Sequence, residues 1–344
     1  MYSDGFVFVT LPIDLSPTSN FAIASSSCST IGDPFPRYAS SSIVIIPFAG
    51  VTIGESGEEK IETKARFGML ISIRTEWTSP TGTQLEGSPM GKHSLTFLPR
   101  DFGVKEYLPA YLNPFITDKD LITGVSFASG GAGYDPLTSK LSNVMSLSSQ
   151  LEMFKQYIQK LKGNIGQEAA MNTITNSVFL VSAGTNDFLP AIFLQEIHKL
   201  GARRIVVFST SAIGCIPIER TLAGGAQRIC VEKYNKAAQV FNSMLKLQLQ
   251  VLASTLPQTR IAFSDFYKPL MNIIENPEQY GLEVTNRGCC GTGELEMSYL
   301  CNKRMTRICH NNSNFFFWDS LHPTEKGSNI FVNLVLSDMM KKLF

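Results

Sequence analysis

The stretch NSVFLVSAG, residues 176–184, decides the fold class of this chain. Its near-continuous apolar run is typical of a strand that is buried on both faces of a sheet. Helical patterns flank this strand on both sides. SLSSQLEMFKQYIQKLKG (146–163) repeats its apolar residues with helical spacing, and FLQEIHKLGA (193–202) has Gly201 where a helix C-cap is expected. The unit therefore has the order helix, buried strand, helix.

The same alternation extends over the rest of the C-terminal two thirds of the chain. LITGVSFAS (121–129), RRIVVFST (203–210) and TRIAFSDFY (259–267) have the composition of strands, and EKYNKAAQVFNSMLKLQLQVLAST (232–255) has the pattern of a helix. Strands that alternate with helices predict an α/β fold with a parallel central sheet and helices on both faces. Ligand sites in such folds form beyond the carboxyl ends of the strands.

The domain organisation is simple. We expect residues 1–40 to form an irregular leader and residues 41–344 to form a single domain with an atypical N-terminal region. SSIVIIPFAGVTIGES (41–56) carries strand signals. The loop-rich segment 267–318 holds four cysteines, and we expect it to be a disulfide-pinned excursion within that domain.

Composition excludes several classes of function. The 344 residues are 44% hydrophobic, which is enough for a sizeable core. Lys and Arg number 30 against 29 Asp and Glu, and no run of about five or more basic residues occurs, so a nucleic-acid partner is not expected. No apolar run approaches the roughly 18 residues of a transmembrane helix. The first 29 residues contain two acidic residues and no Lys or Arg, so they match a secretory signal only weakly.

The cysteine pattern favours disulfides. Six of the seven cysteines follow residue 214, and they form no C-x-x-C pair and no zinc-finger spacing, so a structural metal is not expected. Clustered cysteines in loop-like sequence indicate an oxidising compartment. The sequon at Asn311 points the same way. We expect Cys215 to pair with Cys230, and Cys289 and Cys290 to pair with Cys301 and Cys309 in an order that the sequence leaves open.

Chemistry-bearing residues follow three predicted strands. FFFWDSLHP (315–323) places Asp319 and His322 between an aromatic run and a proline. SAGTNDF (182–188) places Asn186 at a strand end, and ASGGAG (128–133) offers backbone N–H groups beside glycine. An acyl-transfer enzyme needs a nucleophile, a base, a residue that orients the base, and donors to the oxyanion. All of these except the nucleophile are present at strand ends.

These residues carry a family resemblance. The chain resembles plant GDSL esterase/lipases of the SGNH hydrolase superfamily, close to the extracellular-lipase subgroup. The matching stretches are KEYLPAYLNPFITDKDLITGVSFASGGAGYDPLTSKL, FLVSAGTNDF, HKLGARRIVVFSTSAIGCIPIERT, YGLEVTNRGCCGTGELEMSYLCN and FFFWDSLHPTEKG, which together cover most of 104–344. The resemblance implies a flavodoxin-like three-layer sandwich, secretion, a small-molecule or lipid ester as substrate, and no cofactor.

Roles are carried over by position. Asp319 and His322 match the D-x-x-H block of the family, in which the histidine is the base and the aspartate orients it. Asn186 matches the asparagine whose side-chain amide donates to the oxyanion. Gly131, or alternatively Gly130, matches the glycine that donates a backbone N–H to the same oxyanion.

The nucleophile departs from the family pattern, because no GDS motif occurs. TIGDPF (30–35) has a proline where the serine should stand, whereas VTIGESGEE (51–59) has Ser56 after a strand-like lead. PMGKHS (89–94) resembles the PTGRFS that follows the nucleophile in the family. We therefore expect Ser56 to be the nucleophile. The alternative is a catalytically silent relative with a binding role, or a truncated isoform, because the nucleophile motif is altered.

Overall fold

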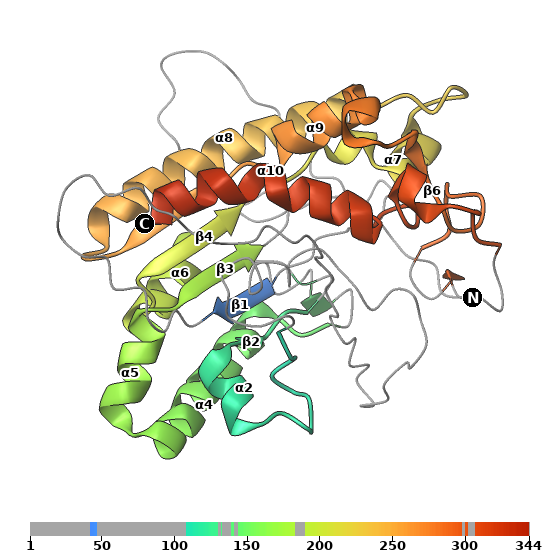
Figure 1. Ribbon diagram of the computed structural model, residues 1–344. Coiled ribbons are helices and arrows are strands. Elements are labelled where there is room, and N and C mark those ends of the chain that lie inside the picture. Colours follow the sequence, from blue (N-terminus) through green and yellow to red (C-terminus); the bar gives the residue numbers. More distant parts are fainter. Residues whose placement is uncertain are drawn as a thin grey trace, which may run out of the picture.

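A five-stranded sheet with the strand order β2-β1-β3-β4-β5 forms the centre of the molecule (Figure 1). The structure, a computed structural model, describes residues 108–129, 132, 139–140, 144–182, 190–297, 300–301 and 307–343, together with the backbone of strand β1. The expected boundary between a leader (1–40) and a domain starting at residue 41 lies outside the described residues, apart from β1 itself.

Three neighbouring strands confirm the predicted parallel sheet. They are β3 (Val178–Ser182), β4 (Arg204–Phe208) and β5 (Arg260–Ser264). They pair in parallel over their full lengths. The apolar residues of β3 and β4 are buried because helices cover both faces of the sheet.

Strand β1 differs from the parallel arrangement. It spans Ser42–Ile46 and runs antiparallel both to β3 and to the short strand β2 (Val125–Ser126). The run SIVII was predicted to be a strand, and that prediction is confirmed. Its direction could not be predicted, because the same alternating N–H and C=O groups serve either kind of pairing.

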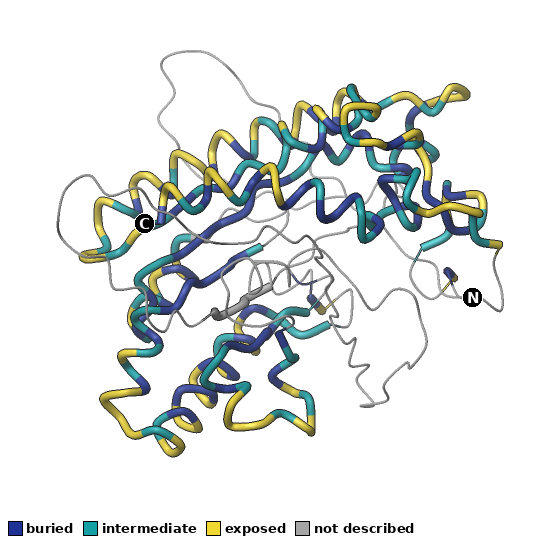
Figure 2. The backbone as a smooth tube through the Cα atoms, in the orientation of Figure 1, coloured by how far each residue is buried: buried dark blue, intermediate teal, exposed yellow. Residues whose placement is uncertain are grey.

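Helices cover the two faces of the sheet and produce three layers. On one face, α4 (Leu147–Ile165), α6 (Pro190–Lys199) and α8 (Glu232–Thr255) share a core with Phe179, Val181, Ile205 and Val207. On the other face, α10 (Glu325–Leu343) packs Val332, Met339 and Leu343 against Val178, Leu180, Val206 and Phe208. Figure 2 shows the buried strands between helices whose outer faces are exposed. The predicted three-layer α/β sandwich is confirmed.

The helices follow their sequence signals closely. Helix α8 has the predicted bounds, and α4 begins after Ser146, whose hydroxyl oxygen accepts the N–H of Ser149. A second helix, α5 (Gln167–Thr175), follows α4 directly. Helix α6 ends just before Gly201, which has φ 112° and packs against Ile174. In the described part of the chain, no helix is both long enough and apolar enough to cross a bilayer.

The strand predicted over 121–129 is wrong at its beginning. Asp118–Thr123 forms helix α2, and only Val125–Ser126 is extended as β2. A capping box explains the difference: the Thr117 hydroxyl accepts the N–H of Asp120, and the Asp120 carboxylate accepts the N–H of Thr117. This local pairing at the helix start overrides the β-like composition of the residues that follow.

The C-terminal part builds a second, smaller sheet. Strands β6 (Val284–Gly288) and β7 (Phe315–Phe317) pair in parallel, near α9 (Tyr267–Glu275) and the single-turn helices η2 (Pro277–Tyr280) and η4 (Asn312–Asn314). Phe316 and Phe317 pack with Phe331 and Val335 of α10. The expected excursion over 267–318 thus has regular elements of its own, and β7 leads directly into the segment that holds Asp319 and His322.

Three disulfides tie the loops of this part together. Cys215 pairs with Cys230, as predicted, and joins η1 (Ile213–Cys215) to the segment before α8. Cys289 pairs with Cys309, and Cys290 pairs with Cys301. The structure therefore chooses one of the two pairings that the sequence left open. A short helix, α7 (Pro217–Ala223), lies between Cys215 and Cys230 in the chain.

Candidate active site

The turn between β7 and α10 carries the acid and the base of the predicted site. The backbone N–H of Trp318 donates to the backbone carbonyl oxygen of His322 at 2.7 Å, which closes the turn. On its far side, the Thr324 N–H donates to the Phe316 carbonyl at 2.7 Å. The Thr324 hydroxyl oxygen accepts the N–H of Gly327 at 2.9 Å and so caps α10. Both ends of the turn are thereby fixed to regular elements.

Within this turn, Asp319 and His322 face each other. One carboxylate oxygen of Asp319, Oδ2, lies 2.7 Å from Nδ1 of His322. The other oxygen, Oδ1, accepts the backbone N–H groups of Leu321 at 2.8 Å and His322 at 2.6 Å. The carboxylate therefore orients the imidazole ring and also holds the backbone that carries it.

Burial and charge differ between the two side chains. The Asp319 side chain is 0% exposed, whereas that of His322 is 23% exposed. Burial by itself would raise the pKa of Asp319. The opposing interactions with His322, and the hydrogen bonds from its ring and from the two backbone N–H groups, hold the pKa below its ordinary value. Because Asp319 is therefore ionised, Nδ1 is the ring nitrogen that carries the proton and donates to it.

The remaining predicted site residues have no described geometry. Ser56, Gly131 (with its alternative Gly130) and Asn186 all lie outside the described residues. The nearest described neighbours in the chain are Ser129 and Ala132 around the glycines, and Ser182 at the end of β3. The structure thus gives the geometry of Asp319 and His322, and the other three positions remain predictions from the sequence.

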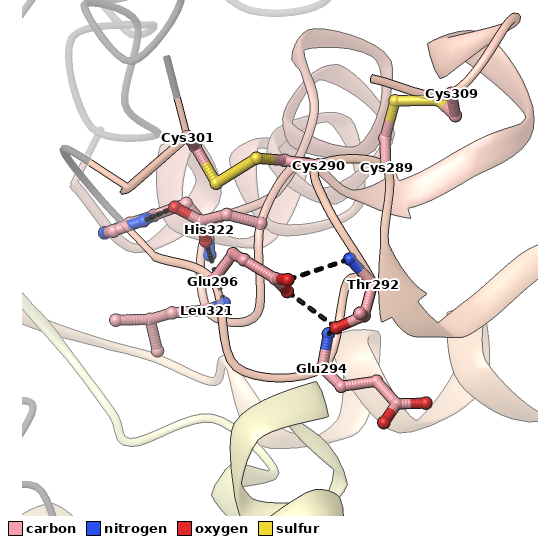
Figure 3. Close-up of a disulfide and its surroundings, with 10 residues drawn as sticks. Cys289, Cys290, Thr292, Glu294, Glu296, Cys301, Cys309, Leu321 and His322 are labelled. Carbon is pink, nitrogen blue, oxygen red and sulfur yellow. Dashed lines mark hydrogen bonds and ion pairs between the residues drawn. A yellow bond between two sulfur atoms is a disulfide. The ribbon is translucent and has the colours of Figure 1, made fainter. Parts of the chain in front are cut away.

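Residues that the sequence did not connect with the candidate site surround this turn. The Cys290 N–H donates to the Trp318 carbonyl at 2.8 Å, and the Cys289 N–H donates to that of Phe317 at 3.1 Å. Figure 3 shows the Cys290–Cys301 disulfide beside His322, with Glu296 and Thr292 in contact nearby. The adjacent cysteines predicted disulfides in this loop, but the sequence did not show that the loop would contact the turn of Asp319 and His322.

The described residues contain no group of three or more His, Cys, Asp or Glu side chains arranged to hold a metal ion. The six cysteines of the described region are all in disulfides. What the arrangement offers chemically is a buried carboxylate that orients a partly exposed imidazole. A nucleophilic triad uses such a pair as the base and the residue that orients the base.

Hydrolases that act on ester bonds are one class of proteins that use an Asp–His pair at the strand ends of an α/β fold. The chain belongs to the GDSL-like lipase/acylhydrolase family, which matches residues 86–335. The resemblance found in the sequence is thus confirmed.

Several curated relatives come from Arabidopsis thaliana. GDSL esterase/lipase EXL3 is 41% identical over 276 residues, which cover 73% of this chain and 76% of the relative. GDSL esterase/lipase EXL2 is 40% identical over 278 residues, which cover 70% of this chain and 73% of the relative. A further GDSL esterase/lipase of the same plant is 44% identical over 263 residues, which cover 70% of this chain and 71% of the relative.

Proposed function

We propose that this chain hydrolyses carboxylic esters through an acyl-enzyme, with Ser56 as nucleophile, His322 as general base and Asp319 as the residue that orients it. The observation that carries the proposal is the 2.7 Å contact between Asp319 Oδ2 and His322 Nδ1 in a turn whose backbone the same carboxylate holds. Membership of a family named for lipases and acylhydrolases supports the reaction class.

The chemistry proceeds in two halves. In the first, Ser56 Oγ attacks the carbonyl carbon of the ester while His322 Nε2 accepts its proton. The side-chain amide of Asn186 and the N–H of Gly131 donate to the oxyanion of the tetrahedral intermediate. The imidazolium then gives its proton to the leaving alkoxide, and the alcohol departs from the acyl-enzyme. In the second half, water repeats the attack, the acid is released, and Ser56 Oγ takes back a proton.

Asp319 contributes without changing its protonation state. A buried, ionised carboxylate next to Nδ1 favours the tautomer that leaves the lone pair on Nε2, and it stabilises the imidazolium that forms when Nε2 accepts the proton. The low pKa of Asp319 keeps the carboxylate ionised throughout. No metal or cofactor has a part in this sequence of steps.

The site of action is proposed to be extracellular, with a small-molecule or lipid ester as substrate. Three disulfides within the region 215–309 support an oxidising compartment, because such links do not persist in a reducing cytosol. Asn311, at the head of the sequon, is exposed and stands just before η4. Both features suit a secreted glycoprotein.

Labelling with a fluorophosphonate probe tests the proposal. Such a probe phosphonylates a serine that a neighbouring base activates, so peptide mapping by mass spectrometry should find the label on Ser56. The Ser56→Ala and His322→Ala variants should not be labelled. Folded wild-type protein that takes up no label would support the alternative, a catalytically silent relative of the family.

A further inference from the structure

Ser320 stands at the tip of the turn, between Asp319 and the residues that the carboxylate holds. Its backbone N–H donates to the carbonyl oxygen of Glu296 at 2.9 Å, and its carbonyl accepts the N–H of Ile218 at 3.0 Å. The residue is fully buried. The turn is therefore held from two sides: by the loop 291–297 on one side and by the start of α7 on the other.

The loop 291–297 is closed by the side chain of Glu296. Its Oε1 accepts the backbone N–H of Thr292 at 3.0 Å, and its Oε2 accepts the Thr292 hydroxyl at 2.7 Å. Gly291 has φ 67°, and a Cβ at this position would stand 2.6 Å from Oε1, so only glycine leaves room for the carboxylate. The carboxylate thus fixes the path of the loop that presents the Glu296 carbonyl to Ser320.

The charge of Glu296 is maintained by these contacts. Partial burial alone would raise its pKa, but the hydrogen bonds from the side chain and backbone of Thr292, and from the backbone of Glu296 and Leu295, lower the pKa to about 2. The carboxylate is therefore ionised at every pH at which an imidazole base works. Hydrogen bonds to an ionised acceptor are stronger than bonds between neutral groups.

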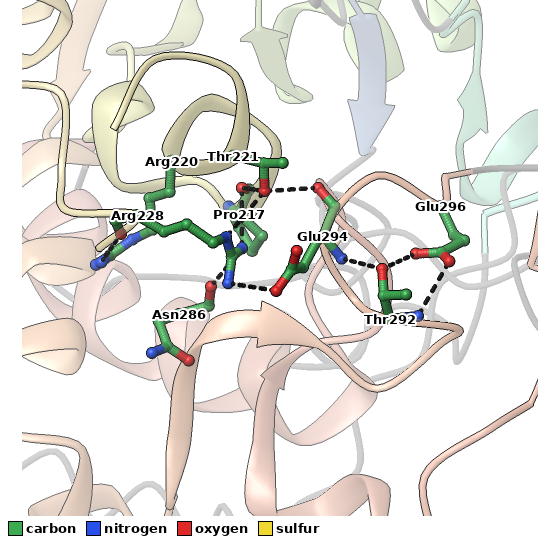
Figure 4. A network of polar contacts seen from close by, with 8 residues as sticks. All are labelled: Pro217, Arg220, Thr221, Arg228, Asn286, Thr292, Glu294 and Glu296. Atoms are coloured by element: carbon green, nitrogen blue, oxygen red, sulfur yellow. Dashed lines mark hydrogen bonds and ion pairs between the residues drawn. The ribbon is translucent and has the colours of Figure 1, made fainter. Parts of the chain in front are cut away.

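Arg228 connects the two supports of the turn to each other (Figure 4). Its Nη1 lies 3.1 Å from Glu294 Oε1 in the loop 291–297. Its Nε donates to the Thr221 hydroxyl at 3.0 Å, and its Nη2 to the Pro217 carbonyl at 3.3 Å, both in α7. The Arg228 side chain is largely buried, at 19% exposure. Arg228 therefore joins the loop and the helix that contact Ser320 from its two sides.

We infer that Glu296 is a positioning residue for the Asp319–His322 pair. The hydrogen bonds from Thr292 to its carboxylate hold the loop 291–297, and the Glu296 carbonyl in that loop accepts the backbone N–H of Ser320. Asp319 and His322 lie one and two residues from Ser320. A loop 291–297 that is no longer held therefore changes the angle and the distance between the Asp319 carboxylate and the His322 ring. The consequence for turnover rests on the proposed function, whereas the consequence for the geometry does not.

The matched variants Thr292→Val and Thr292→Ser test the inference. Valine keeps the size of threonine and removes the hydroxyl that donates to Glu296, whereas serine keeps that hydroxyl. We expect Thr292→Val to lower kcat by about 10- to 100-fold with little change in KM, because a small misplacement of the base acts in the transition state. Thr292→Ser should retain most of the wild-type kcat. Glu296→Gln, which keeps the length of the side chain, is the second variant and should resemble Thr292→Val.

A second measurement is independent of turnover. The proton on His322 Nδ1, held by Asp319, has its own downfield NMR resonance, which a His322→Gln spectrum identifies among the four histidines. We expect this resonance to shift or broaden in Thr292→Val and Glu296→Gln. It should stay in place in Thr292→Ser and in the control Glu152→Gln, whose partner Lys155 lies on the exposed face of α4.

The outcomes separate the two proposals. A wild-type kcat and an unchanged Nδ1 resonance in Thr292→Val and Glu296→Gln would overturn the positioning role. So would an equal loss in Thr292→Val and Thr292→Ser, because the hydroxyl would then not matter. Wild-type protein that neither hydrolyses esters nor labels at Ser56 would instead contradict the proposed function, and in that case the resonance alone decides whether Glu296 positions the pair.

Discussion

Gly288 packs directly against the backbone of Asp319. A Cβ built at Gly288 would stand 2.5 Å from the Asp319 carbonyl oxygen and 2.8 Å from its Cα. Real Cβ atoms do not approach backbone that closely, so the absence of a side chain at the end of β6 is what allows the turn to lie where it does. This contact joins two segments that are 31 residues apart in the sequence, counted from 288 to 319.

We expect Gly288→Ala to displace Asp319 and to impair both stability and hydrolysis. The clash is with backbone, which cannot rotate away, so the cost in unfolding free energy should be about 1–3 kcal/mol, as for other overpacked sites. The matched control is Gly163→Ala in α4, where nothing lies within 4 Å of the new Cβ. That change should stabilise the protein by about 0.5–1 kcal/mol. Thermal melts and ester hydrolysis of both variants give the comparison, and equal behaviour of the two would contradict this reading of the contact.

Asp319→Asn should abolish most activity while the fold persists. The amide can still accept the N–H groups of Leu321 and His322 through its oxygen, but its NH₂ then faces Nδ1. This arrangement places the ring proton on Nε2, which can no longer accept the proton of a nucleophile. We expect kcat to fall by about 10²- to 10⁴-fold with a nearly unchanged melting temperature. Turnover close to wild type would show that the carboxylate has no part in the reaction.

Removal of the Cys290–Cys301 disulfide should loosen the turn as well as the loop. The link closes a loop with a sequence separation of 11, for which the expected loss of stability is roughly 3 kcal/mol. The Cys290 N–H also donates to the Trp318 carbonyl, so hydrolysis should fall along with the melting temperature in Cys290→Ala/Cys301→Ala. The control is Glu152→Gln on the exposed face of α4, which should change neither quantity. Full activity in the double variant would mean that the turn holds its shape unaided.

Glu219 should make the protein less stable as the pH rises. It lies in α7, and burial raises its pKa from 4.5 to about 7. Between these two values the folded protein keeps a proton that the unfolded chain releases, so the free energy of unfolding falls with rising pH and the loss is complete above about pH 7. Glu219→Gln removes this effect. Allowing for the partial exposure of the side chain, the variant should be about 1–2 kcal/mol more stable than wild type at pH 8, and much closer to wild type at pH 5. Urea titrations at the two pH values give the numbers, and a difference that does not depend on pH would refute the assignment.

Elements with a strong local pattern could be predicted from the sequence. Helix α8 has the predicted bounds, because its apolar residues recur with helical spacing over 24 residues. Strand β3 could be predicted from its near-continuous apolar run alone. Helix α2 was not predicted, because the capping box of Thr117 and Asp120 that starts it precedes residues 121–129, whose composition is typical of a strand. The antiparallel direction of β1 depends on connections and not on its own residues.

The site shows the same division between local and distant contacts. Asp319 and His322 could be found because they lie three residues apart and one turn brings them together. Gly288, Glu296 and Arg228 could not be found in this way. Gly288 and Arg228 contact segments far away in the chain, and the local contact of Glu296 with Thr292 matters only because the loop it closes reaches Ser320. Only the folded structure shows that Gly288 lies against Asp319, that the Glu296 carbonyl accepts the Ser320 N–H, and that Arg228 joins the loop 291–297 to α7.

The most direct test of the whole account is a crystal structure of the fluorophosphonate-treated protein. We expect phosphorus bound to Ser56 Oγ, that oxygen within about 2.6–3.2 Å of His322 Nε2, and phosphonyl oxygen near the N–H of Gly131 and the amide of Asn186. A His322 ring with no serine hydroxyl within reach, or phosphorus on a different serine, would contradict the assignment of the nucleophile.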